Sequence, residues 1–438
     1  MNNNNVIDKL GLQLNEMQKA TEEAILHTGK DVVVMSPTGS GKTYAYLLPL
    51  IQRLDANSDE LQAVVLLPGR ELALQSAMVL KDMGSGLRSM ALYGGRPTMD
   101  EHRVLRDVKP QIVFVTPGRL NDHLDKKNLN AETIKWLVID EFDKCLELGF
   151  QGEMMSILNK LPNIERRILL SATESESIPA FVSMGRTIYL DYRTDDDNIP
   201  DRVHLYTVTS PEKDKLDTLK RLLLSLGNES TIVFSNYRES VERVATFLKE
   251  NGFVVSWYHG GLEQDEREAA LYRFSNGSIS ILISTDLASR GLDIPDVDNI
   301  IHYNIPETED NYIHRVGRTA RWDKEGRTFF ILGPGEMLPE YVSKENEAFQ
   351  LPTNLPKPTL PRMATIYIGK GKKDKISKID IVGFLCKKIG LQSSEIGKID
   401  IKDRYCYVAI DRTKVKKVIL ASKGQKIKGI KTIVEEVR

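Results

Sequence analysis

The chain has 438 residues, of which 41% are hydrophobic and 28% charged, as in soluble globular proteins with substantial cores. At roughly 100–200 residues per domain, this length predicts about three domains. No apolar run approaches the roughly 18 residues of a membrane helix, and the amino terminus lacks the layout of a secretory signal. The three cysteines are scattered along the chain, at Cys145, Cys386 and Cys406. This spacing favours reduced thiols and no metal cluster. We therefore expect a cytoplasmic protein without membrane contact.

Charge is distributed unevenly along the chain. The chain has 60 basic and 61 acidic residues. From residue 357 to the end there are 21 basic and 8 acidic residues, whereas the first 356 residues contain 39 basic and 53 acidic ones. A basic module attached to an acidic body is typical of a protein that tethers itself to nucleic acid. The alternative is a lysine-rich surface that only interacts with solvent, and charge alone leaves both interpretations open.

From the amino terminus, short and continuously apolar segments alternate with stretches of helical character. Continuous apolar strands separated by helices predict a parallel sheet that is covered on both faces. The pattern stops in the polar stretch 191–202 and then starts again, which predicts two similar α/β lobes joined by a linker. The expected strands are 32–35, 64–67, 112–115, 137–139 and 168–170 in the first lobe, and 232–234, 254–257, 281–283, 300–303 and 328–332 in the second.

A second linker and a small third domain follow the two lobes. The linker contains Pro352, Pro356, Pro358 and Pro361, which exclude a regular element. Beyond it the pattern predicts the order β-α-β-β-α-β. The expected strands are 365–368, 396–401, 405–410 and 430–434, and the expected helices begin near residue 377 and cover about 414–421. The predicted domains are 1–193, 203–345 and 362–438.

A phosphate-binding sequence follows the first expected strand. Residues 36–43 read Ser-Pro-Thr-Gly-Ser-Gly-Lys-Thr before a helical stretch, which is the context of a P-loop. Its glycines allow backbone N–H groups to curl around phosphates at a helix N-terminus. Lys42 is expected to reach the β- and γ-phosphates, and the Thr43 hydroxyl to bind Mg²⁺. The alternative, a glycine-rich turn without nucleotide, is disfavoured by the Gly-Lys-Thr ending. The predicted ATP contacts here are Ser36, Thr38, Gly39, Ser40, Gly41, Lys42 and Thr43.

Two adjacent acids stand at the end of the expected strand 137–139. We expect Asp140 to hold Mg²⁺, through water, and Glu141 to accept a proton from the attacking water. Paired acids at a strand end can also be a solvated turn. Their position about a hundred residues after a P-loop favours the catalytic interpretation.

Together with the segments around them, these sites resemble the DEAD-box family of superfamily 2 RNA helicases, over about residues 10–335. Gln18 stands where the family's Q motif reads adenine, since a side-chain amide can bond two adenine edge atoms at once. Residues 140–143, Asp-Glu-Phe-Asp, resemble the motif that names the family, and residues 171–173, Ser-Ala-Thr, the motif that couples hydrolysis to strand separation. The resemblance implies first-lobe RNA contacts at Arg70, Gly95, Thr116 and Arg119.

The second lobe continues the resemblance. Segments 232–235, 264–267 and 285–293 are similar to motifs that face RNA and the ribose, which implies RNA contacts at Arg267 and Thr285 and a nucleotide contact at Asp293. Residues 314–321 are similar to the arginine-finger motif, which implies catalytic roles for Arg318 and Arg321. Guanidinium groups from the opposite lobe neutralise charge developing on the γ-phosphate, so hydrolysis would require lobe closure. The alternative for such a His/Arg cluster is a surface ion-pair network.

Four positions depart from the family pattern. Phe142 replaces the alanine of the family motif and is expected to need room beside the metal site. Gly69 replaces a threonine, and Ala320 stands where glycine is common. The upstream aromatic of the Q motif would fall at Met1 and is absent, which predicts weaker adenine stacking. The catalytic residues are retained, and the resemblance therefore implies an active ATPase.

The tail resembles the C-terminal RNA-binding domain of the DbpA branch of this family, on segments 369–376, 395–401 and 405–410. The resemblance implies an RRM-like fold and, as target, a hairpin of the large-subunit ribosomal RNA. Tyr367, Tyr405 and Tyr407 fall on neighbouring expected strands, at positions where RRM aromatics stack bases. The alternative is that these tyrosines are ordinary strand residues.

Stacking on this sheet is expected to be partial. The second aromatic motif of an RRM usually begins with a basic residue and glycine, but this chain has Asp403 and Arg404 there. The last aromatic residue of that motif is replaced by Ile410. Lysines of the preceding loop are therefore expected to carry much of the contact. The predicted RNA-binding residues of the tail are Lys372, Lys373, Arg404, Tyr405 and Tyr407.

The predicted fold is thus α/β, with two RecA-like doubly wound parallel-sheet domains in tandem and a small α+β RRM-like domain. The predicted protein is a monomer that binds ATP, Mg²⁺ and RNA, and that locally unwinds ribosomal RNA duplexes during ribosome assembly. Two alternatives stay open. A nucleotide-gated RNA clamp would turn over ATP without displacing strands, and a DNA helicase would be activated by DNA instead of RNA.

Overall fold

A computed structural model describes residues 7, 11, 13–37, 39–95, 98–172, 178–193, 202–286, 297–320, 324–342 and 345–437. The described chain forms two compact units, of which the first ends before residue 199. The second unit holds the second lobe and the tail. Within the described residues, no helix combines the length and apolar character needed to cross a membrane.

The first unit is built on a seven-stranded parallel sheet in the order β3-β4-β2-β5-β6-β1-β7. Alternate residues of each strand enter two separate hydrophobic clusters. Val32 and Val34 join helices α2 to α4 on one face, whereas Val33 joins helices α6 to α8 on the other. The strands are β1 (Asp31–Met35), β2 (Ala63–Leu66), β3 (Ser89–Leu92), β4 (Ile112–Val115), β5 (Trp136–Ile139), β6 (Arg166–Ser171) and β7 (Thr187–Asp191).

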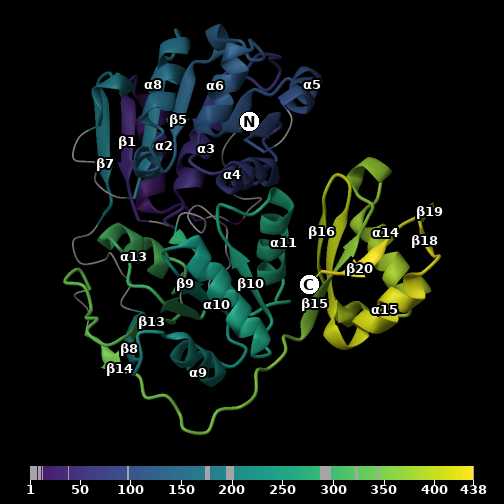
Figure 1. Cartoon of the computed structure of the whole chain (residues 1–438). Helices are drawn as coiled ribbons and strands as arrows, with labels where there is room; N and C mark the ends of the chain where they lie inside the picture. Colours follow the sequence, from purple (N-terminus) through teal and green to yellow (C-terminus); the bar gives the residue numbers. More distant parts are fainter. Residues whose placement is uncertain are drawn as a thin grey trace. The chain divides into compact units, whose positions relative to one another are not determined.

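Helices connect these strands and cover both faces of the sheet (Figure 1). This two-sided burial explains why the central strands read as continuous apolar runs. The helices are α2 (Glu16–His27), α3 (Lys42–Arg53), α4 (Arg70–Met83), α5 (Thr98–Val108), α6 (Pro117–Asp125), α7 (Phe142–Glu147) and α8 (Gln151–Lys160). Short 3₁₀ turns cover Ala131–Thr133 and Ala180–Val182.

The second lobe repeats this design with a parallel sheet in the order β10-β11-β9-β12-β13-β8-β14. Helices α9 and α10 share one hydrophobic cluster with the sheet, and helix α13 packs on the opposite face. The strands are β8 (Val203–Thr209), β9 (Thr231–Phe234), β10 (Val255–Tyr258), β11 (Ile281–Ser284), β12 (Asn299–His302), β13 (Gly326–Leu332) and β14 (Glu347–Ala348). The helices are α9 (Leu216–Leu226), α10 (Arg238–Glu250), α11 (Gln264–Ser275) and α13 (Glu309–Val316).

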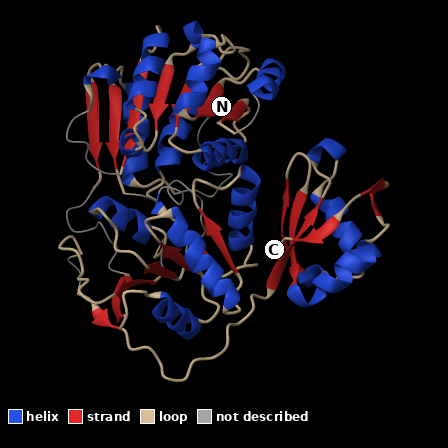
Figure 2. Ribbon diagram, in the orientation of Figure 1, coloured by secondary structure: helices blue, strands red, loops and turns tan. Residues whose placement is uncertain are grey.

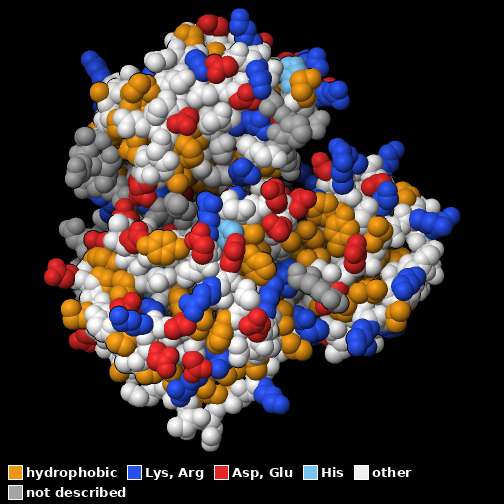
Figure 3. Space-filling model, in the orientation of Figure 1, with side chains coloured by type: hydrophobic (Ala, Val, Ile, Leu, Met, Phe, Trp, Pro, Cys, Tyr) orange, Lys and Arg blue, Asp and Glu red, His pale blue; other side chains and the backbone are white. Residues whose placement is uncertain are grey.

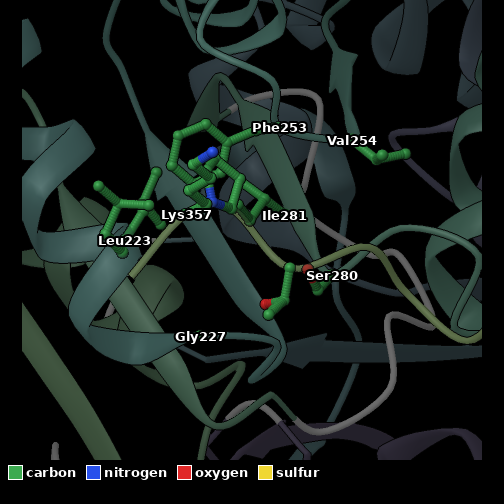
Figure 4. A pocket seen from close by; sticks show the side chains of 10 residues that line it. Leu223, Gly227, Phe253, Val254, Ser280, Ile281 and Lys357 are labelled. Atoms are coloured by element: carbon green, nitrogen blue, oxygen red, sulfur yellow. The ribbon is translucent and has the colours of Figure 1, made fainter. Parts of the chain in front are cut away.

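The proline-rich linker after the second lobe lacks a regular element, as predicted, and lies against that lobe. Its residue Lys357 lines a small pocket together with Leu223 and Phe253 (Figure 4). The Asn228 side chain donates a 3.4 Å hydrogen bond to the Leu360 carbonyl. The linker therefore has fixed contacts with the lobe that it leaves.

The tail is an antiparallel four-stranded sheet in the order β16-β17-β15-β20, with helices packed on one face (Figure 2). Its elements follow the predicted β-α-β-β-α-β order. The strands are β15 (Met363–Ile368), β16 (Ile396–Ile401), β17 (Cys406–Asp411), β18 (Lys426–Ile427), β19 (Ile430–Lys431) and β20 (Val434–Glu436). The helices are α14 (Lys378–Gly383), its π-helical continuation Phe384–Lys388, and α15 (Val415–Ser422), and 3₁₀ turns cover Lys372–Asp374, Ser393–Glu395 and Arg412–Lys414.

The predicted fold class is confirmed by these three sheets. The last strand, predicted at 430–434, is wrong in detail, because residues 430–431 belong to a short hairpin and the sheet strand starts at Val434. Strands β3, β7 and β8 were not predicted. Their residues are only partly buried or alternate between buried and exposed, so they lack the continuous apolar signal of the central strands.

Candidate nucleotide and RNA sites

The P-loop joins strand β1 to the N-terminus of helix α3. Gly39 and Gly41 have φ angles of 85° and 86°, which only glycine adopts without strain. Gly41 is also the N-cap residue of helix α3, and a side chain there would collide with the Gln18 amide. The loop is thereby curled at a helix N-terminus, where backbone N–H groups and the helix dipole favour phosphate.

Lys42 lies inside this curl. Its ammonium group donates hydrogen bonds of 2.6 Å to the Ser36 carbonyl and 3.0 Å to the Pro37 carbonyl. Burial lowers the pKa of Lys42, while the nearby charges of Asp140 and Glu141 oppose that shift. A half-buried cation thus lies between the loop and the acidic pair, and the predicted phosphate contact of Lys42 stays a prediction.

The acidic pair follows strand β5. Asp140 is 3% exposed, and burial raises the pKa of its carboxyl group to about 6, against the opposing effect of Lys42. Its carboxylate accepts a 3.0 Å hydrogen bond from the Glu141 backbone N–H. Glu141 has a φ of 50°, a left-handed conformation that costs a non-glycine residue of order 1 kcal/mol. Such strain is concentrated at functional sites, which supports the predicted role of Glu141.

Tyr46 is a neighbour of this site that the sequence did not single out. It is fully buried in helix α3, and burial followed by the Asp140 charge raises the pKa of its hydroxyl well above the usual range. The signal in the sequence is its position three residues after Thr43, which places both on one face of the helix.

Gln18 is fixed to the P-loop. It is residue N3 of helix α2 and forms a capping box with Asn15, in which Asn15 N–H donates to the Gln18 side chain at 3.0 Å. The Gln18 amide donates a 3.2 Å hydrogen bond to the Gly41 carbonyl, and the Asn15 amide donates to the Ser40 carbonyl at 3.0 Å. The predicted adenine contact of Gln18 stays a prediction. The Asn-x-x-Gln pattern of a capping box was the signal for Asn15.

Phe142, which was expected to need room beside the metal site, has its side chain in the hydrophobic core of the first lobe. Its side chain is 2% exposed and belongs to the hydrophobic cluster that includes Ile139, Cys145 and Leu169. As the first residue of helix α7, it points its ring into the core. The larger side chain is therefore part of the packing of the first lobe.

Two predicted RNA contacts of the first lobe lie together. The Arg70 guanidinium lies next to Gly94 and Gly95. Gly95 has a φ of 91°, and a Cβ atom added to it would lie 2.7 Å from Arg70 Nη1. Thr116 is the half-buried N-cap residue of helix α6. These positions fit a backbone-binding surface, and their RNA contacts stay predictions.

Arg119 is buried in an ion-pair network. Its Nε lies 3.1 Å from both the Tyr93 carbonyl and Glu101 Oε2, and Glu101 also contacts His123 Nε2 at 3.0 Å. Arg119 is 9% exposed, and its side chain fastens the chain just before Gly94. A direct RNA contact by Arg119 stays a prediction.

In the second lobe, Arg267 braces the turn before helix α11, where its guanidinium donates to the Gly260 carbonyl at 3.0 Å. Thr285 follows strand β11 and is 7% exposed, and Arg318 follows helix α13 and is 2% exposed. The predicted residues Thr38, Thr173, Asp293 and Arg321 lie outside the described residues.

Arg315 was not predicted, although it adjoins the expected arginine fingers. It is 1% exposed, and its guanidinium donates to both carboxylate oxygens of Asp286 at 2.5 and 2.7 Å. It also donates to the Asn236 side chain and the Asn304 carbonyl, each at 2.8 Å. Arg315 thereby ties helix α13 to the ends of strands β9, β11 and β12. Only the His-Arg doublet at 314–315 signalled it.

On the tail, the predicted basic residues form one exposed cluster. The backbone N–H groups of Lys372 and Lys373 donate 2.9 Å hydrogen bonds to the carbonyls of Lys402 and Asp403. Arg404 follows directly, and the side chains of Lys372, Lys373 and Arg404 are exposed. Lys and Arg side chains recur over the visible face of the tail (Figure 3).

The tail tyrosines are partly covered by the second lobe. Tyr407 is 5% exposed and stacks on Tyr272 of helix α11, with ring centroids 5.2 Å apart. The Tyr405 hydroxyl donates a 3.1 Å hydrogen bond to Glu268, and the Tyr367 and Tyr405 rings lie 5.4 Å apart. Base stacking on Tyr407 would require the separation of Tyr407 from Tyr272. The predicted RNA contacts of Tyr405 and Tyr407 stay predictions.

Parallel-sheet lobes that carry a P-loop and an acidic pair define a nucleotide-hydrolysing motor of the helicase class. Family comparisons refine this class. The DEAD/DEAH box helicase family matches residues 15–181, the helicase conserved C-terminal domain 214–323, and the DbpA RNA binding domain 365–436. The chain belongs to the DEAD-box family and is an ATP-dependent RNA helicase.

Individual relatives agree with this assignment. The ATP-dependent RNA helicase DbpA of Escherichia coli is 35% identical over 434 residues, which cover 97% of this chain and 94% of the relative. CshA of Listeria monocytogenes is 35% identical over 338 residues, 74% of this chain and 64% of the relative. Among solved structures, Saccharomyces cerevisiae Dbp5 bound to RNA and ADP BeF3 has a TM-score of 0.69 at 26% identity, covering 80% of this chain and 93% of that one.

Proposed function

We propose that this RNA helicase acts on large-subunit ribosomal RNA during ribosome assembly, as a cytoplasmic monomer that uses ATP with Mg²⁺. The observation that carries the proposal is the tail, which matches the DbpA RNA binding domain over residues 365–436. A relative of the same domain composition, the E. coli helicase DbpA, aligns along nearly the whole chain. The tail would bring the motor to its RNA, because a basic domain supplies affinity that does not depend on the motor's own contacts.

The first-lobe site suits Mg²⁺. Thr43 and Asp140 offer hard oxygen ligands of the kind that Mg²⁺ prefers. Burial raises the pKa of the Asp140 carboxyl to about 6 despite the charge of Lys42, so a cation bound beside it would further stabilise the carboxylate. When bound, Mg²⁺ would neutralise charge on the β- and γ-phosphates.

The chain's own residues would divide the work of ATP hydrolysis. Lys42 would move its hydrogen bonds from the Ser36 and Pro37 carbonyls to phosphate oxygens. Glu141 would orient the attacking water and take its proton, and Arg318 and Arg321 would stabilise charge on the γ-phosphate. Because these arginines belong to the second lobe, hydrolysis would require that the lobes close on RNA.

In the tail, the exposed cluster of Lys372, Lys373 and Arg404 would carry the RNA contact. Because these cations are exposed, they can bind phosphates without first breaking contacts within the protein. The tyrosines of the same sheet would contribute stacking only when they are released from helix α11, since Tyr407 packs on Tyr272.

The proposal is tested by crosslinking the full-length protein to cellular RNA and mapping the sites. We expect enrichment on one helix of large-subunit ribosomal RNA, and loss of that enrichment in the variant Lys372→Gln/Lys373→Gln/Arg404→Gln. The variant Lys213→Gln, which removes an exposed charge of the second lobe, is the control and should retain the enrichment. A flat distribution over transcripts for the wild type would contradict the proposed target and leave a general RNA helicase.

A further inference from the structure

A cavity of about 350 Å³ lies in the second unit between the second lobe and the tail. The lobe contributes residues from the end of helix α10, from helix α11 and from the loop at Ser278, and the tail contributes strand β15 and residues near the ends of β17 and β20. Its charged lining residues are Lys249, Arg273, Arg412 and Glu436. Three cations thus face one carboxylate.

Several contacts hold the walls of this cavity together. The Thr365 hydroxyl of strand β15 donates to Ser278 Oγ at 2.8 Å and accepts from the Asn276 amide at 3.0 Å. Arg412 Nη2 donates to the Ser278 carbonyl at 2.8 Å. Next to them, Tyr272 stacks on Tyr407. The cavity is therefore a formed site, in which both domains supply the lining.

The three cations have no counter-charge in contact with them. Arg273 is 9% exposed and donates only to a neutral partner, Ser256 Oγ, at 3.0 Å. Lys249 lies 4.0 Å above the Trp257 ring. Arg412 donates to the carbonyls of Pro361, Met363 and Ser278 at 2.6 to 2.8 Å. Within the described part of the chain, none of the three forms an ion pair.

This arrangement is unfavourable without a ligand. Burial lowers the pKa of Arg273 to about 10, and the neighbouring Arg412 contributes to that shift. Burial and the Arg273 charge likewise lower the pKa of Lys249. The cations therefore repel one another, and the charge of Glu436 offsets this only in part. For Arg273, which is buried, an unpaired charge is costly. An anion between them would offset that cost.

We propose that this cavity binds a phosphate oxyanion, supplied either by the RNA backbone or by free phosphate. Guanidinium and ammonium groups are the usual partners of phosphate, and a buried arginine offers geometrically fixed donors. A second cavity of about 190 Å³ also contains Lys249 and Arg273 in its lining, which leaves room for the chain of a longer ligand beside the phosphate. The site is separate from the P-loop, and its existence does not depend on the proposed ribosomal target.

Inorganic phosphate is the first probe, and Trp257 gives a local readout. The chain has three tryptophans, and Lys249 contacts the ring of Trp257. The full-length protein is titrated with phosphate at constant ionic strength, with saturating ADP and Mg²⁺ to fill the P-loop, while the Trp257 indole N–H signal is followed by NMR. The signal is assigned with Trp257→Phe.

We expect a saturable movement of this signal in the wild type and in the control Lys213→Gln. In Arg273→Gln the phosphate affinity should fall at least tenfold. Lys249→Gln should also weaken phosphate binding. Because Lys249 is exposed on the helix surface, this variant is expected to fold and provides the test if Arg273→Gln does not.

The source of the phosphate is decided by the salt dependence of single-stranded RNA binding. Loss of one phosphate contact reduces the slope of log K against log salt by about 0.7. A reduced slope in Arg273→Gln, with the wild-type slope retained in Lys213→Gln, identifies the RNA backbone. A moving Trp257 signal with an unchanged slope identifies free phosphate. If phosphate does not move the Trp257 signal and the variant keeps the wild-type slope, the proposal is wrong.

Discussion

At the scale of single residues, the ATP site depends on side chains that are fixed by contacts outside their own motif. Gln18 donates to the Gly41 carbonyl, and Lys42 donates to Ser36 and Pro37. These contacts preform the curl of the P-loop. Preformed donors reduce the ordering that ligand binding must otherwise supply.

Gly41 is the residue on which this curl depends most directly. Its φ of 86° and the adjacent Gln18 amide leave no room for a side chain. Gly41→Ala is expected to weaken ATP binding at least tenfold in a direct binding measurement, because the loop and the Gln18 contact must both shift. Gly69→Ala is the matched control, since Gly69 has a φ of −130° and an added Cβ would meet only Glu71 Oε2, at an ordinary contact distance of 4.0 Å. Equal ATP affinity in the two variants would contradict this account.

Phe142 stabilises the first lobe and is not expected to control the metal site. Phe142→Ala, which restores the family residue, should lower the free energy of unfolding by about 3–5 kcal/mol, since it leaves a cavity in the core. Urea denaturation measures this change, and ATP turnover of the folded variant at low temperature should persist. Met155→Ala, at a 42% exposed site, should change stability by less than about 0.5 kcal/mol. Unchanged stability together with lost turnover in Phe142→Ala would place the ring at the catalytic site instead.

The motifs predicted which residues gather around the P-loop, and they did not predict side-chain directions that packing sets. Lys42 lies near Asp140, and Gln18 contacts the loop at Gly41. Phe142 turns into the core, and Arg119 turns into the Glu101 ion pair. Neither direction is encoded within its own motif, because both depend on helices contributed by distant segments.

At the scale of elements, helix α13 is held to its sheet by one buried polar network. Arg315 reaches Asp286, Asn236 and Asn304, and His302 on strand β12 contacts both Arg315 and Thr328. The network positions the end of α13, from which the predicted finger Arg318 follows.

His302 makes this network sensitive to acid. Burial, followed by the Arg315 charge, lowers the pKa of His302 well below its usual range, so the folded imidazole stays neutral. The unfolded chain takes up a proton below about pH 6.5. The contribution of His302 to stability is therefore complete above that pH and is lost as the pH falls below it, by up to about 1.4 kcal/mol per pH unit.

Hydrogen exchange of the β12 and β13 amides measures this loss locally. We expect the protection of these amides to decrease between pH 6.5 and pH 5 in the wild type, after correction for intrinsic exchange, and to depend less on pH in His302→Asn. His204→Asn, at an exposed position, should behave like the wild type. A pH dependence that is equally steep in His302→Asn would show that another group causes it.

The sequence predicted elements well where both faces of a strand are buried. The central strands β1, β2, β4, β5 and β6 match the expected positions closely. Strands β3, β7 and β8 have weaker burial, so their apolar pattern does not differ enough from that of a loop. The hairpin β18–β19 turns at Lys428 and Gly429, both with positive φ, so residues 430–431 pair with β18, and pairing with β15 begins only at Val434.

At the scale of the whole molecule, the predicted functional residues are divided among the two lobes and the tail. Lys42, Asp140 and Glu141 belong to the first unit, and Arg318 belongs to the second. The tail adds an exposed basic cluster and contacts helix α11 through Tyr407. Helix α11, which contacts the tail through Tyr272, also carries the segment 264–267 that is predicted to face RNA.

This division also bears on the alternatives to a helicase. The clamp alternative supposes that Phe142 damages the coupling of ATP hydrolysis to strand separation. Phe142 packs in the core of the first lobe, and strand-displacement assays alongside ATP turnover separate a clamp from a helicase. The DNA alternative is disfavoured by membership of a family of RNA helicases.

The most direct test of the account is ATP turnover with and without RNA, for the wild type, for Glu141→Gln and for Glu165→Gln. Glu165 is exposed and paired with Lys135, which makes it a matched control. We predict that RNA stimulates turnover in the wild type and in Glu165→Gln. Glu141→Gln should bind ATP and RNA but hydrolyse ATP about 10²–10⁴-fold more slowly, as expected for loss of a general base. Unchanged turnover in Glu141→Gln, or turnover in the wild type that RNA does not stimulate, would contradict the account.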